Sequence, residues 1–144
     1  RFPQRDRYRG DKGRRQSLNI VDSSAWLAYF ADDRNAEYFA EPIENTPELL
    51  VPSITLAEVF KIILRQRDED VALAAIAQME QGQVIVLDSR LSIDAAYYGI
   101  KYKLPLADSI IYATAMKYDA IIWTQDDDFE SLNGVKYFPK LDRK

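Results

Sequence analysis

The sequence predicts an α/β domain with a mostly parallel central sheet, because short β-branched runs alternate along the chain with longer stretches of helical periodicity. A length of 144 residues and an apolar fraction of 47% fit one domain with a substantial core. The chain has no cysteine, no visible signal peptide and no apolar run of the roughly 20 residues that a membrane span needs. We therefore expect a soluble, cytoplasmic protein without disulfides.

The first half of the chain is expected to begin with a strand at residues 18–21. Asp22 follows directly and can open a short helix that runs to Phe30. Residues 49–52 then predict a brief extended segment, and apolar residues at helical spacing predict a helix from about Thr55.

The second half predicts three more helices and a strand. Asp68 can cap a helix that Gly82 stops, and the β-branched run at 84–87 is the next strand. Residues 91–102 have helical spacing. Pro105 is well placed as the first residue of a helix over 105–118.

The last two predicted strands flank a run of three carboxylates. A buried strand at 120–123 leads into Asp126, Asp127 and Asp128, and the Asn133-Gly134 pair predicts a turn into an edge strand at 135–138.

The chain contains neither histidine nor cysteine, so it lacks the usual zinc ligands, the imidazole base and the thiolate nucleophile. Any chemistry must use carboxylates, hydroxyls, amines and an ion that they hold.

Four acidic residues share one position in this pattern, at the carboxyl end of a predicted strand or in the first turn of the next helix. They are Asp22, Glu58, Asp108 and Asp126. Each has an ordinary alternative role as a helix cap, a capping-box partner or a turn residue. The coincidence of all four favours a shared pocket, because the carboxyl ends of parallel strands meet at one edge of a sheet.

Charge repulsion predicts what such a pocket binds. Two unit charges about 4 Å apart repel by roughly 4 kcal/mol at an effective dielectric near 20. Four carboxylates must therefore take up protons or a cation, and an all-oxygen site suits Mg²⁺ or Mn²⁺. Such ions support the hydrolysis of phosphodiesters.

These residues resemble the PIN-domain nucleases, and within that family the toxin ribonucleases of VapBC toxin–antitoxin pairs. The resemblance covers about residues 18–139. It rests on four segments, 20–24, 54–59, 104–115 and 124–135, whose order and spacing carry more weight than any one of them.

The resemblance implies a three-layer PIN-like fold and an endoribonuclease that depends on Mg²⁺ or Mn²⁺. The four acids above would be its catalytic and metal-binding quartet, with Asp128 as an outer ligand and with Thr124 and Ser23 as supporting residues. It further implies an RNA substrate, a homodimer and an antitoxin that covers the acidic pocket.

Three alternatives stay open at this point. The chain can be a PIN-domain nuclease that processes RNA outside a toxin–antitoxin pair, or a silent PIN domain used only for binding. It can also be a phosphoacceptor receiver module, with Asp88 phosphorylated after the strand at 84–87 and Asp22 holding Mg²⁺. The receiver reading lacks the lysine that such a module needs after the strand at 120–123.

The first sixteen residues differ in charge from the rest. Residues 1–15 carry seven basic and two acidic side chains, a sum of +5. Because the whole chain has a net charge of −4, the remaining residues sum to −9. We expect residues 1–16 to be a disordered basic arm or a cloning remnant, and residues 17–144 to be the nuclease domain. An arm of this charge can contact RNA phosphates.

Overall fold

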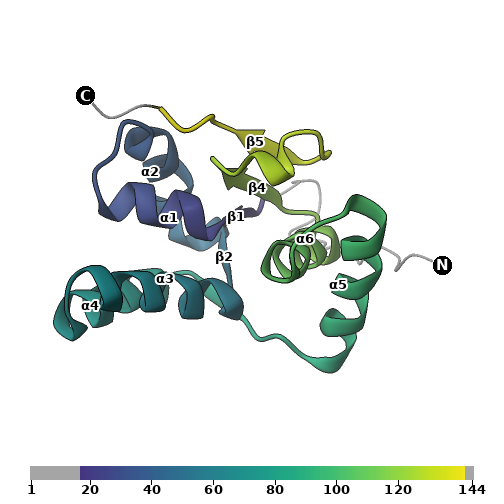
Figure 1. The fold of residues 1–144 in the computed structure, drawn as a ribbon, viewed down its shortest axis with the longest axis horizontal. Coiled ribbons are helices and arrows are strands. Elements are labelled where there is room, and N and C mark those ends of the chain that lie inside the picture. Colours follow the sequence, from purple (N-terminus) through teal and green to yellow (C-terminus); the bar gives the residue numbers. More distant parts are fainter. Residues whose placement is uncertain (1–16, 142–144) are drawn as a thin grey trace.

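A computed structural model describes residues 17–141, in which a five-stranded sheet lies between two groups of helices (Figure 1). The strand order is β3-β2-β1-β4-β5, and all neighbours are parallel. The strands are β1 (Asn19–Val21), β2 (Leu49–Pro52), β3 (Gln83–Ile85), β4 (Ile121–Thr124) and β5 (Val135–Tyr137). The helices are α1 (Ser23–Phe30), α2 (Ala36–Glu44), α3 (Ser53–Gln66), α4 (Glu69–Met79), α5 (Ser89–Tyr102) and α6 (Leu106–Tyr118). The expected α/β architecture is confirmed.

The sheet separates two hydrophobic cores. Along β1, Ile20 packs with α5 and α6, whereas Val21 packs with α1 to α4. Along β4, Ile122 and Trp123 divide between the same two cores. This alternation follows from the two-residue period of a strand, and it makes three layers with both faces of the sheet covered. Figure 1 shows α5 and α6 on one side of the sheet and the other four helices opposite them.

Two elements differ from the sequence prediction. Helix α2 was not predicted, because Pro42 in its interior disfavours a helix, but buried Phe39 and Ile43 at helical spacing hold it against the core. The strand predicted at 84–87 ends at Ile85, and Asp88 instead caps α5 by accepting a hydrogen bond from the Leu91 N–H at 2.8 Å.

The helix predicted from about Thr55 begins earlier, at Ser53. The Thr55 hydroxyl donates to the Pro52 carbonyl at 2.7 Å, so Thr55 is not the cap of α3. Glu58 consequently lies in the second turn of α3 and not in a capping box with Thr55.

The turn before the last strand is as predicted. Gly134 has a φ of +76°, which glycine adopts without strain, and β5 follows at the edge of the sheet. None of the helices within residues 17–141 has the length and hydropathy that a membrane span requires. The predicted basic arm at residues 1–16 lies outside the described residues.

Candidate active site

The pairing of β1 with β4 brings two of the predicted acids to one edge of the sheet. Asp22 follows β1 and Asp126 follows β4, and the Asp22 N–H donates to the Trp123 carbonyl at 3.1 Å. The parallel register, with Val21 opposite Trp123, places both strand ends at the same level. Asp108 joins them from the first turn of α6.

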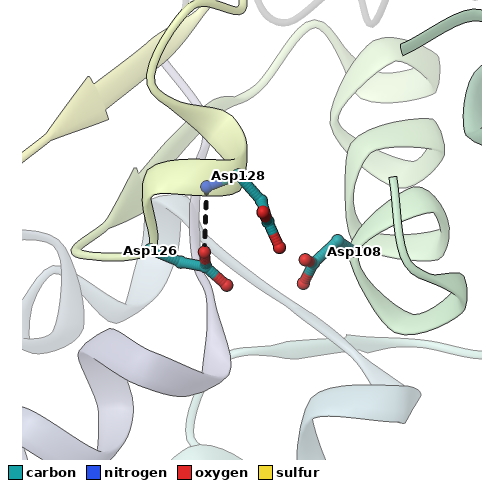
Figure 2. A group of neighbouring side chains, drawn as sticks. All are labelled: Asp108, Asp126 and Asp128. Atoms are coloured by element: carbon teal, nitrogen blue, oxygen red, sulfur yellow. Dashed lines mark hydrogen bonds between the residues drawn. The ribbon is translucent and has the colours of Figure 1, made fainter. Parts of the chain in front are cut away.

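Asp108, Asp126 and Asp128 form a carboxylate triad. One oxygen from each lies within 4.8 Å of one from each of the others. Figure 2 shows the Asp128 side chain directed toward Asp108, with Asp126 beside them at the start of the 3₁₀ turn η2 (Asp127–Phe129). The Asp128 N–H donates to Asp126 Oδ1 at 2.9 Å, which orients the Asp126 carboxylate. The expected outer residue, Asp128, is therefore a member of the triad itself.

Asp22 is the most buried acid at this edge, with 2% of its surface exposed. Its Oδ1 accepts hydrogen bonds from the Ser24 hydroxyl at 2.8 Å and from the Ala25 N–H at 3.3 Å, so Asp22 also caps α1. Burial raises the pKa of Asp22 to about 7, although these hydrogen bonds favour the charged carboxylate and lower the pKa. The charge of Asp126 adds to the rise.

Two members of the triad, Asp108 and Asp126, have raised pKa values. Burial is the largest cause of a pKa of about 8 for Asp108, followed by the charge of Asp126 and a hydrogen bond with Asp128. Burial also raises the pKa of Asp126, and the charges of Asp128 and Asp127 add to this effect. The crowding that the sequence predicted is thus present, and it favours the binding of protons or a cation.

Glu58, the fourth predicted acid, does not belong to the triad. Its Oε1 accepts a hydrogen bond from the Ser23 hydroxyl at 2.6 Å, which ties the second turn of α3 to the first turn of α1. Ser23 directly follows Asp22, so this bond holds Glu58 near the buried acid. Ser23, predicted as a supporting residue, thus contacts one of the four predicted acids through its hydroxyl.

The hydroxyl of Thr124 organises the loop after β4. Thr124 is fully buried, and its Oγ1 accepts a hydrogen bond from the Asp126 N–H at 2.9 Å. Ser24, which the sequence did not single out, contacts the same loop by accepting from the Gln125 N–H at 3.3 Å. No sequence signal distinguishes Ser24 from Ser23, because both follow Asp22 in the first turn of α1.

The donor set is made entirely of oxygen atoms from carboxylates and hydroxyls. Such a set matches the preference of Mg²⁺ and Mn²⁺, which take carboxylate ligands and retain several waters. The raised pKa values mean that a cation would replace protons at Asp22 and Asp108. The geometry can therefore hold a hard divalent ion next to a solvent-accessible edge.

Residues 20–135 match the family model for the PIN domain. The chain belongs to the PIN domain family. The receiver alternative loses its support, since Asp88 follows edge strand β3 and serves as the cap of α5. A search of curated proteins finds no match.

Several solved structures share this PIN fold. A toxin–antitoxin complex from Klebsiella pneumoniae has a TM-score of 0.71 at 22% identity, covering 85% of this chain and 99% of that chain. VapC20 from Mycobacterium tuberculosis, a sarcin-ricin loop cleaving toxin, has a TM-score of 0.69 at 19% identity, covering 81% and 96%. DNA-bound VapBC from Salmonella typhimurium has a TM-score of 0.66 at 15% identity, covering 85% and 98%. At these identities the likeness establishes the fold.

Proposed function

We propose that this PIN domain is an endoribonuclease that depends on Mg²⁺ or Mn²⁺ and that hydrolyses RNA phosphodiester bonds. The observation that carries the proposal is the triad of Asp108, Asp126 and Asp128 beside buried Asp22. The chain contains no histidine, so a pair of imidazoles cannot activate the ribose 2′-hydroxyl. Carboxylates at a sheet edge leave metal-assisted hydrolysis as the chemistry that fits.

In this proposal, the metal-binding and catalytic residues are the predicted quartet together with Asp128: Asp22, Glu58, Asp108, Asp126 and Asp128. Held by these residues, Mg²⁺ or Mn²⁺ would lower the pKa of the attacking water and would stabilise negative charge on the phosphate and the leaving oxygen. Asp128 orients Asp126 through its N–H, while Ser23 holds Glu58 in place. Thr124 fixes the start of the loop that carries Asp126.

The proposed biological role is the toxin of a toxin–antitoxin pair. Support comes from the shared fold with the Klebsiella pneumoniae complex and with VapBC from Salmonella typhimurium. The proposal includes an antitoxin that covers the acidic pocket and a homodimeric toxin. The alternative to the toxin role is a PIN-domain nuclease that processes RNA outside a toxin–antitoxin pair, which would cleave RNA without arresting growth.

The test is cleavage of defined RNAs by the purified protein with and without Mn²⁺, with mapping of the product ends. We expect 3′-hydroxyl and 5′-phosphate ends, no cleavage in EDTA, and loss of cleavage in Asp108→Asn and Asp126→Asn. Asp70→Asn is the matched control, because Asp70 is an exposed acid in the first turn of α4. Equal cleavage by all of these variants would place the activity elsewhere.

The toxin role needs a second readout. Expression of the wild-type chain should arrest bacterial growth, and the Asp126→Asn variant should not. Co-expression of the product of an adjacent small gene should relieve the arrest and bind the wild-type protein. RNA cleavage without growth arrest would favour the RNA-processing alternative.

A further inference from the structure

Ser24 joins two loops that lie about one hundred residues apart in the sequence. Its hydroxyl donates to Asp22 Oδ1 at 2.8 Å and accepts from the Gln125 N–H at 3.3 Å. The same oxygen lies 3.5 Å from Thr124 Oγ1. One side chain therefore contacts both the acid after β1 and the backbone that leads to Asp126.

We propose that Ser24 is a positioning residue that sets the distance between Asp22 and the loop that leads from β4 to Asp126. By setting this distance, Ser24 controls the affinity of the site for a divalent ion. This inference rests on the proposed function, since it assigns a role at the same site. Residues that hydrogen-bond to ligating carboxylates fix ligand orientation, and their loss costs about 10- to 100-fold in metal affinity.

The hydrogen-bond inventory of a serine explains why Ser24 is suited to this role. A hydroxyl has a single proton, and here it points at Asp22, so the oxygen is left to accept from Gln125. The two bonds thus have a fixed direction. A displacement of either loop would break one of them.

The start of α1 does not depend on Ser24. Asp22 caps the helix by accepting from the Ala25 N–H, whereas the Ser24 hydroxyl bonds to Asp22 and Gln125, which both lie outside α1. Removal of this hydroxyl should therefore leave the helix intact. The expected effect is on the relative placement of Asp22 and Asp126.

Gln125 has a second anchor on its side chain. Asn35, which is 3% exposed, donates to Gln125 Oε1 at 3.2 Å and to the Pro139 carbonyl at 3.0 Å. The loop is thus held by Ser24 at its backbone and by Asn35 at its side chain. A Ser24→Ala variant keeps the second anchor, which favours a folded protein with a loosened metal site.

The experiment measures Mn²⁺ binding to the full chain by electron paramagnetic resonance and, independently, the rise in melting temperature with Mn²⁺. Ser24→Ala should bind Mn²⁺ about 10- to 100-fold more weakly. Ser24→Thr retains the hydroxyl and should bind within a few-fold of wild type. Ser92→Ala is the matched control, because Ser92 carries an exposed hydroxyl near the start of another Asp-capped helix, α5.

Cleavage kinetics give a third readout. In Ser24→Ala, kcat should fall at low Mn²⁺ and recover at saturating Mn²⁺, with KM for RNA unchanged. Mn²⁺ affinity equal to that of wild type, or an equal loss in Ser92→Ala, would overturn the positioning role alone. Failure of the wild-type protein to bind Mn²⁺ would overturn the proposed function and this inference with it.

Discussion

Replacing Asp22 with asparagine should change how the stability of the metal-free protein depends on pH. Asp22 is 2% exposed, and its pKa of about 7 in the folded chain compares with 3.8 for an ordinary aspartate. Between these values the folded state binds a proton that the unfolded chain has released. Stability from this group is therefore fully present below about pH 4 and is lost as pH rises through about 7.

The magnitude follows from the size of the pKa difference. Each pKa unit corresponds to 1.36 kcal/mol, so the rise from 3.8 to about 7 makes the free energy of unfolding fall by about 4 kcal/mol over this interval. Asparagine does not titrate, and it is as good a helix cap as aspartate. The variant should consequently lose this contribution to the pH dependence and keep α1.

The assay is urea unfolding of wild type and Asp22→Asn in EDTA at several pH values from 4 to 8.5. The wild-type free energy of unfolding should fall more steeply with pH, so that the variant gains relative to wild type as pH rises. Asp108, whose pKa is also raised, leaves a residual decline in both proteins. Parallel curves for the two proteins would refute the assignment of a high pKa to Asp22.

Four further outcomes are expected. Mn²⁺ should raise the melting temperature more at pH 8 than at pH 5, because at pH 5 the cation must displace protons from the carboxylates. The Asp108→Asn variant should show a smaller rise. A rise equal to that of wild type would remove Asp108 from the site. Asp128→Asn should weaken Mn²⁺ binding about tenfold or more in a calorimetric titration, and an unchanged affinity would return Asp128 to an outer role. Gly134→Ala should cost about 1 kcal/mol in urea unfolding through its positive φ alone, since an added Cβ meets nothing within 4 Å. Deleting residues 1–15 should weaken RNA binding at low salt in a filter assay, and unchanged binding would mark this segment as a remnant.

The sequence predicted the order of strands and helices well, because period-two and period-3.6 patterns are strong in most elements. Helix α2 was missed because Pro42 breaks the local helix signal while tertiary packing of Phe39 overrides it. The boundary between β3 and α5 was misplaced because Val86 continues the β-branched run, although it is 71% exposed. Local composition cannot register such tertiary effects.

The site was predictable to the level of the sheet edge. The rule that parallel strands end at one edge placed Asp22 and Asp126 near each other. It does not by itself place Asp108, because α6 follows α5 and not a strand. The sequence could not predict which members of the acidic run face Asp108, because that depends on the 3₁₀ turn that brings Asp128 into the triad. It also could not separate Ser24 from Ser23, whose directions depend on how α1 packs beside β4.

The most direct test of the central claim is a crystal structure of the protein grown with Mn²⁺, with anomalous differences measured for manganese. We expect an anomalous peak about 2 Å from carboxylate oxygens of Asp108 and Asp126, on the side of the sheet edge where Asp22 lies. Full Mn²⁺ occupancy at another place, or no peak at this edge in saturating Mn²⁺, would contradict it.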